Sequence, residues 1–276
     1  MSSNIPLQPT RPAEPPRKRQ SHLRLALLFA ACGLVAAAAV LPYQLAVTQA
    51  TPAAADVPLA VSVIASLAQA AVLTFLASWL GLAMAGRVGL GAPLLRSRVY
   101  RGESGRSRPR WSWGGFAVGA VGSLIGTIVL LVLDIWLFQP RMPEVEQAES
   151  VALWKGALTF LYGGVVEEVL LRLFTMTLIV WLIAKLMRRE AGRIPAAVYV
   201  AGIVLAALLF GVGHLPATQA AFGELTPWLV ARGLIANGML GLWFGYLYWR
   251  RGLEYAIAAH MVADLLLHLI APALLS

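Results

Sequence analysis

The sequence predicts an all-α protein, a polytopic bundle of seven or eight transmembrane helices. Hydrophobic residues make up 59% and charged residues 13% of its 276 residues, whereas a soluble domain carries about 25% charged residues. The mean hydropathy is +0.73. The apolar residues form long runs, and a hydrocarbon core roughly 30 Å thick requires runs of about 20 residues from a helix. The chain shows no strand pattern and no internal repeat.

The formal net charge is +9, and the placement of the positive residues along the chain indicates how the protein is oriented in the membrane. Most arginines stand between the apolar runs, as the positive-inside rule describes for cytoplasmic loops. We therefore expect a multi-pass protein of the plasma membrane with a cytoplasmic N-terminus, in contact with anionic headgroups and with no nucleic-acid partner. The single cysteine, Cys32, excludes an intrachain disulfide bond.

The N-terminal part divides into a tail and three helices. Residues 1–22 are rich in proline and polar residues and predict a disordered cytoplasmic tail. Within residues 23–150 we expect spans at about 23–47, 59–85 and 115–138. The first run is too long for the apolar core of a cleaved signal peptide. The loop after the second span carries seven arginines against a single Glu103, which predicts a basic cytoplasmic loop.

Residues 151–276 form the second predicted region. Its first apolar stretch, 151–187, is too long for one straight crossing, and two crossings would put both flanking loops on one side. We interpret it as one crossing that continues as a helix in or near the interface, with Gly163 and Gly164 permitting a bend or a close helix approach. Further spans are expected at about 195–214, 226–249 and 253–275, the last two joined by a tight turn at 250–252.

Ionisable residues inside these spans are the main functional signal, because they are costly in a membrane and mark function by default. Glu168 and Arg172 are four residues apart and share a helix face, so they can form an ion pair. Glu167 points roughly 100° away, which leaves its carboxylate free to act as a general base. The alternative is a buried ion network that only orients helices.

Two histidines extend the pattern. His214 follows Phe210 by one helical turn near the end of an apolar run, and a lone histidine there is more often interfacial than catalytic. His260 and Asp264 share a helix face, and an acceptor one turn away can fix the tautomer of an imidazole. The alternative is a pair that merely satisfies itself. We expect His268 to line the same face, and we assign packing or helix-contact roles to three further polar residues: Asp134, Arg232 and Asn237.

At these residues the chain resembles the CAAX-protease and bacteriocin-processing (CPBP, or Abi) family of intramembrane endopeptidases. The family carries a Glu-Glu-x-x-x-Arg, a Phe-x-x-x-His and a His-x-x-x-Asn/Asp motif in that order. The corresponding sequences here are EEVLLR at 167–172, FGVGH at 210–214 and HMVAD at 260–264. Each motif alone is weak, but three in order are fairly specific. The resemblance covers about residues 151–271.

The resemblance implies a helical bundle with a catalytic site inside the membrane. It implies that Glu167 activates a water molecule, that His214 assists that water, and that His260 with Asp264 stabilises the oxyanion. Glu168 and Arg172 would shape the site. Where the family often has asparagine, an ionised Asp264 cannot donate a hydrogen bond, so it must be protonated or must orient His260.

The predicted spans place His214 near the outer end of its helix and His260 about two turns from the inner end of its own. Tilts or kinks must therefore bring the two histidines together.

The predicted function is an intramembrane endopeptidase that hydrolyses a peptide bond in a membrane-associated substrate, CAAX-like or other. We expect no cofactor and no metal, although Glu167, His214 and His260 would also form a zinc ligand set with water in the fourth position. Two other functions stay open. One is a non-catalytic membrane immunity or binding protein, and the other is a proton-coupled transporter that uses the same groups as a relay.

Overall fold

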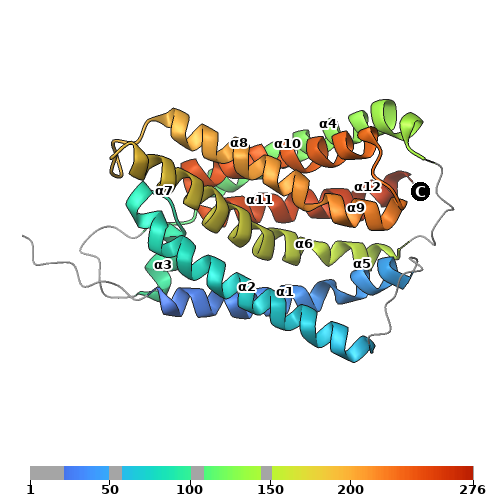
Figure 1. Cartoon of the computed structure of the whole chain (residues 1–276), viewed down its shortest axis with the longest axis horizontal. Coiled ribbons are helices and arrows are strands. Elements are labelled where there is room, and N and C mark those ends of the chain that lie inside the picture. Colours follow the sequence, from blue (N-terminus) through green and yellow to red (C-terminus); the bar gives the residue numbers. More distant parts are fainter. Residues whose placement is uncertain (1–21, 50–57, 101–108, 144–150, 276) are drawn as a thin grey trace, which may run out of the picture.

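The structure is a computed structural model that describes residues 22–49, 58–100, 109–143 and 151–275, and every regular element in these ranges is a helix. The helices run along the long axis of one bundle (Figure 1). The predicted tail, residues 1–22, lies outside the described residues except for His22. Six helical segments are long and apolar enough to cross a membrane, and a further long helix, α10, packs among them. The all-α transmembrane bundle is therefore confirmed.

The first part of the chain contributes α1 (Leu23–Gln49), α2 (Leu59–Val88) and α4 (Trp113–Leu133), with a π-helical turn, η1 (Asp134–Phe138), at the end of α4 and a 3-10 turn, η2 (Gln139–Arg141), after it. These match the three expected spans within a few residues. One element was not predicted: α3 (Pro93–Val99) is a short helix inside the basic loop. It is held against the rest of the protein because the Leu95 amide donates to the buried carboxylate of Glu254, at 2.8 Å.

The long apolar stretch forms a single helical run that crosses the whole bundle. It comprises α5 (Leu153–Ala157), α6 (Thr159–Leu161), η3 (Tyr162–Glu167), η4 (Val169–Met176) and α7 (Thr177–Leu186). By length and composition the 34 residues from Leu153 to Leu186 count as one candidate span, and the middle of this run, η3 and η4, is π-helical. This continuous run agrees with the predicted single crossing, and the predicted continuation in or near the interface stays a prediction. The π-helical winding was not predicted.

The remaining helices complete the bundle. They are α8 (Ala196–Gly213), α9 (Leu215–Phe222), α10 (Pro227–Arg251), α11 (Leu253–Leu265), η5 (Leu266–Ile270) and α12 (Ala271–Leu275). The turn between α10 and α11 is made by Gly252, whose φ of 103° lies in the left-handed region that favours glycine. An added Cβ there would meet Pro93 at 2.7 Å.

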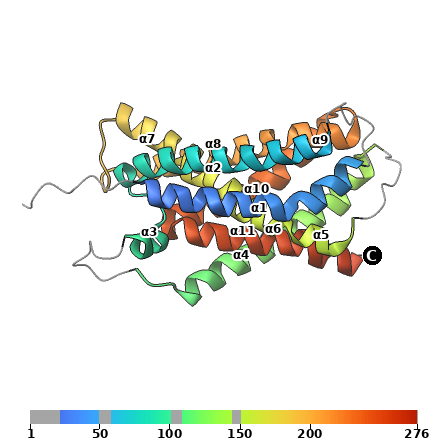
Figure 2. The ribbon, with the colours of Figure 1, turned by 90° about the horizontal axis from the view of Figure 1, so that it is seen from below.

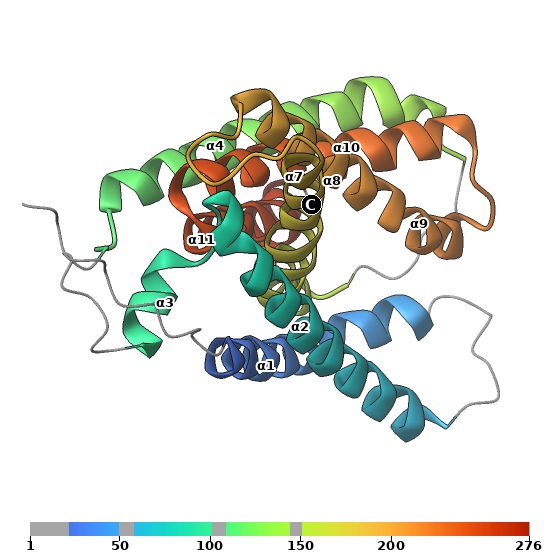
Figure 3. The same ribbon diagram turned by 60° about the vertical axis from the view of Figure 1, so that its left-hand side comes forward.

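The helices form two groups with the α5–α7 run between them. α1 and α2 pack together on one side, while α4, α8, α10 and α11 pack on the other (Figure 3). Small residues permit this close packing: a Cβ on Gly241 of α10 would lie 3.2 Å from Ala207 of α8. In Figure 2, α1 passes across the middle of the bundle. The N-terminal helices contact the segments that carry two of the motifs: α1 packs against η3, α2 against η4 and α4 against α11.

Candidate active site

A cavity of about 710 Å³ lies between the two helix groups. Its wall contains residues from α1, α4, the α5–α7 run, α8, α10 and α11. Four of the six predicted site residues line it, namely Glu167, His214, His260 and Asp264. The other two, Glu168 and Arg172, are fully buried behind the wall. Elements far apart in the chain therefore meet at one place.

Glu167 stands at the centre of this cluster, at the end of η3. One carboxylate oxygen lies 3.9 Å from Nε2 of His214 and the other lies 3.8 Å from Nε2 of His260. These separations exceed hydrogen-bonding distance. A water oxygen about 2.8 Å from both the Glu167 carboxylate oxygen and Nε2 of His214 would have an angle of roughly 90° between these two hydrogen-bond partners. The carboxylate is therefore placed to share a polar ligand with either histidine.

The tautomer of His214 follows from its partner. Nδ1 lies 2.9 Å from the carbonyl oxygen of Phe210. Because a carbonyl can only accept a hydrogen bond, Nδ1 carries the proton and donates it. Neutral His214 consequently presents the lone pair of Nε2 toward Glu167 and the cavity. The Phe210 ring also packs edge-on against His214, with centroids 4.7 Å apart, and fixes the ring orientation.

His260 is held from behind by Glu168. Its Nδ1 lies 2.8 Å from Oε1 of Glu168, and the same oxygen lies 3.1 Å from Nη1 of Arg172. The Phe244 ring stacks on the imidazole at 4.4 Å. Spacing along the helix suggested Asp264 as the residue that orients His260. Glu168 accepts the observed hydrogen bond instead, because Nδ1 of His260 faces the α5–α7 run, while Asp264 lies 3.5 Å from Nε2 on the other edge of the ring.

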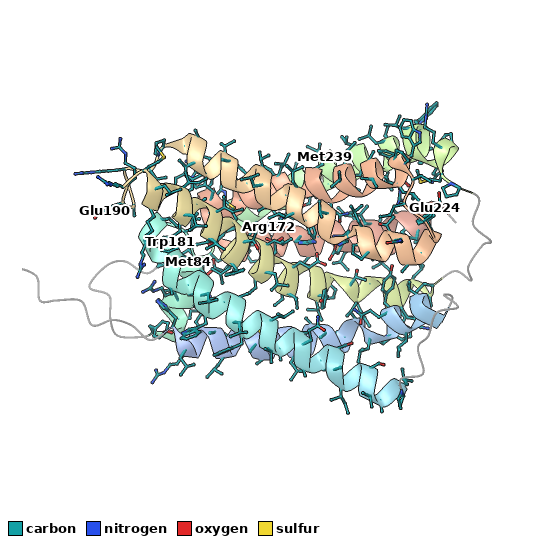
Figure 4. The ribbon with its side chains drawn as sticks, in the orientation of Figure 1. Met84, Arg172, Trp181, Glu190, Glu224 and Met239 are labelled. Carbon is teal, nitrogen blue, oxygen red and sulfur yellow. The ribbon has the colours of Figure 1, made fainter. Side chains whose placement is uncertain are left out.

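Arg172 closes this arrangement on its buried side. The predicted ion pair with Glu168 is present, and the side chains of Glu168 and Arg172 are 0% and 1% exposed. The guanidinium also donates to the carbonyl oxygen of Gly241, at 3.0 Å. It lies between the rings of Phe210 and Phe244, at 5.2 and 5.5 Å from their centroids, which adds cation–π attraction. Figure 4 shows Arg172 inside the bundle.

Asp264 owes its position to a glycine on the facing helix. A Cβ added to Gly163 would overlap the Asp264 carboxylate and lie 3.0 Å from Nε2 of His260. The neighbouring Gly164 packs against Met261 in the same way. The two glycines therefore let α11 approach the α5–α7 run closely enough for the third motif to reach the first. A π-helical segment at this point also matches the frequent occurrence of π-bulges at functional sites.

The two histidines meet despite their different places along α8 and α11. His214 is 18 residues from the start of α8, whose first residue is Ala196, and His260 is only seven residues from Leu253. The helices are tilted relative to each other (Figure 3), so that both rings reach the carboxylate of Glu167. His268 also lines the cavity, as expected.

The sequence reading assigned Asp134 and Arg232 to helix contacts, and the structure adds that both line the cavity. The guanidinium of Arg232, on α10, donates to both carboxylate oxygens of Asp134, on η1. Asn237 lines the same wall and donates to the carbonyl oxygen of Gly233, at 2.9 Å. Their membership of the cavity depends on helix packing, so no local pattern announced it.

The same geometry bears on metal binding. Within the part of the chain that the structure describes, no group of three or more His, Cys, Asp or Glu side chains has an arrangement that could hold a metal ion. Glu167, His214 and His260 are the three residues that would bind a zinc ion. The Glu167 oxygens lie 3.9 Å from Nε2 of His214 and 3.8 Å from Nε2 of His260. A metal-free site stays a prediction for experiment.

Comparison with known proteins gives a family match over part of the chain. Residues 149–266 match the model of a family described as type II CAAX prenyl endopeptidase Rce1-like. This match agrees with the CAAX-protease family that the three motifs indicated, and it points to a peptidase in a membrane. Neither the curated proteins nor the solved structures give a match. The matched segment contains all six predicted site residues.

Proposed function

We propose that this protein is an intramembrane endopeptidase of the glutamate type, which hydrolyses a peptide bond in a membrane-associated substrate, CAAX-like or other. The observation that carries the proposal is the placement of the two carboxylate oxygens of Glu167 opposite Nε2 of His214 and of His260 on the wall of one cavity. A carboxylate and two imidazoles are the groups that water activation and oxyanion stabilisation require.

In the proposed reaction, Glu167 takes a proton from a water molecule while Nε2 of His214 accepts a second hydrogen bond from it. The water oxygen attacks the peptide carbonyl carbon, and the carbonyl oxygen becomes an oxyanion. As the oxyanion collapses and the peptide C–N bond breaks, Glu167 passes the proton to the leaving amine, and the other fragment ends in a carboxylic acid. The chain supplies the base, the orientation of the water and a cavity that encloses the reacting groups.

His260 is the proposed donor to the oxyanion. Because its Nδ1 proton goes to Glu168, Nε2 can donate only when the ring is an imidazolium. Three carboxylates within 4 Å of the ring supply the counter-charge, from Glu167, Glu168 and Asp264. Glu168 is therefore a positioning residue that fixes the ring, and Arg172 holds Glu168 in turn.

The test uses the purified protein in detergent with a library of lipidated and plain membrane peptides, and cleavage is read by mass spectrometry. Wild type is compared with Glu167→Gln and His260→Ala, each with and without a zinc chelator. Glu190→Gln is the matched control, since Glu190 is exposed and far from the cavity (Figure 4). We expect wild type and Glu190→Gln to cleave, chelator to have no effect, and both site variants to lose activity.

The outcomes separate the competing functions. Cleavage by Glu167→Gln at the wild-type rate would remove Glu167 from the mechanism. Loss of wild-type activity with the chelator, restored by added zinc, would make the enzyme a metalloprotease. If no peptide is cleaved and proton-driven flux appears in liposomes, the transporter function replaces the peptidase.

A further inference from the structure

Positive charge is concentrated at one end of the bundle. This basic end is the end at which α2 and α10 finish and α4, α8 and α11 begin (Figure 1). Of the described arginines and lysines, eleven lie there, and they are Arg24, Arg87, Arg96, Arg98, Arg110, Lys185, Arg188, Arg189, Arg193, Arg250 and Arg251. Arg141, Lys155 and Arg232 lie toward the opposite, far end. Such an excess of positive charge marks the cytoplasmic side.

The cavity extends away from the basic end. On α1 its lining residues fall within 40–47, on α4 and η1 within 130–138, on the α5–α7 run within 159–167, and on α8 and α9 within 210–217. Given the helix directions, these stretches lie in the far part of each segment. On α10 and α11 the lining residues reach back to Phe244 and His260, each seven residues from the basic end of its helix.

The space between the cavity and the basic end is filled by core side chains. Arg172 is buried behind the cavity wall, and beyond it Leu173, Met176, Leu247 and Tyr248 are 0–1% exposed. Toward the far end exposure rises again: the side chain of His214 is 38% exposed, and Ala217 is exposed on the wall. The cavity is therefore closed toward the basic end and open in the other direction.

We infer that the active-site cavity opens on the non-cytoplasmic face of the membrane and takes a peptide segment presented from that face. The buried side chains between the cavity and the basic end indicate the direction of the opening. The distribution of arginines and lysines indicates which end of the bundle is cytoplasmic. A polar peptide that arrived from the basic end would have to displace the buried layer below Arg172, whereas from the far end it meets a polar, exposed rim. Only the nature of the ligand, a peptide, rests on the proposed function.

Single-cysteine labelling tests the side of the membrane without any turnover. Cys32 is the only cysteine, so Cys32→Ser provides the background for three reporters. Glu190→Cys reports the basic end and Glu224→Cys the far end; both residues are exposed, and Figure 4 shows them at opposite ends of the bundle. Ala217→Cys reports the cavity wall itself. Each variant is exposed to a charged maleimide in sealed right-side-out membrane vesicles and again after detergent is added.

We expect Glu224→Cys and Ala217→Cys to label in sealed vesicles to nearly the extent seen in detergent, and Glu190→Cys to gain its label only with detergent. The inverse pattern would overturn the inference, as would equal labelling of Glu190→Cys and Glu224→Cys before detergent, or no labelling of Ala217→Cys before detergent. A substrate peptide added outside the same vesicles forms the second arm. Correct labelling without cleavage would count against the peptidase function but leave the orientation standing.

Discussion

Replacing Arg172 by methionine removes the most deeply buried cation of the described bundle. The substitution keeps an unbranched apolar stem but deletes three interactions: the ion pair with Glu168, the hydrogen bond to Gly241 and the stacking between two phenylalanine rings. It leaves the carboxylate of Glu168, which is 0% exposed, without its cation. The expected result is a large loss of stability.

The magnitude follows from burial. Breaking a buried ion pair by removing one partner costs about 3–5 kcal/mol. For a chain of this size, roughly 2–4 °C of Tm corresponds to each kcal/mol, so the expected drop is about 6–20 °C. The matched control is Arg232→Met. In its ion pair with Asp134, the Arg232 side chain is 38% exposed and the Asp134 side chain is 25% exposed. Solvent screening limits such a pair to about 1 kcal/mol, or at most about 4 °C.

The assay is thermal unfolding of purified variants, followed by tryptophan fluorescence in one detergent at one scan rate, because irreversible unfolding makes Tm depend on that rate. Equal shifts for Arg172→Met and Arg232→Met would refute the reasoning from burial. A third variant separates the unpaired charge from the lost packing. Glu168→Leu combined with Arg172→Met removes both charges and should melt above Arg172→Met alone.

Two further predictions concern single contacts. Gly163→Ala should lower kcat/KM about 100-fold, because the added Cβ displaces the Asp264 carboxylate and a shift of about 1 Å can have that effect. The control is Gly213→Ala, which should keep the wild-type kcat/KM because nothing lies within 4 Å of its added Cβ. Equal kcat/KM values for the two variants would contradict the prediction. Tyr248→Phe removes the hydrogen bond between the Tyr248 and Thr177 hydroxyl groups, formed at 2.7 Å. Because such a bond contributes about 1 kcal/mol, Tm should fall by about 2–4 °C. An unchanged Tm in the unfolding assay would show that this bond contributes nothing to stability.

Much of the fold could be predicted from the sequence because a membrane imposes a simple code. Backbone polar groups must be satisfied within each segment, so an apolar run of sufficient length becomes a helix. This logic located the spans within a few residues. It gave no sign of the π-helical winding of η3 and η4, which depends on how the α5–α7 run packs against its neighbours. The short helix α3 was missed because it is held by the distant residue Glu254.

The candidate site divides in the same way. Local spacing identified the residues that carry chemistry, since Glu168 with Arg172 and His260 with Asp264 are each one turn apart, and charge inside a span is costly enough to stand out. Which groups would meet was decided by packing between segments about 90 residues apart. Tertiary contacts directed Glu168 to His260 and placed Glu167 between two histidines.

The sequence by itself therefore determined the helices, the basic side of the bundle and the ionisable residues, because each depends on one segment and its surroundings. Only the tertiary structure decided that these residues share one cavity, that Glu168 rather than Asp264 orients His260, and that the cavity faces away from the basic end. These features depend on helix tilt and on close approach at Gly163 and Gly164, which arise only when the segments pack together.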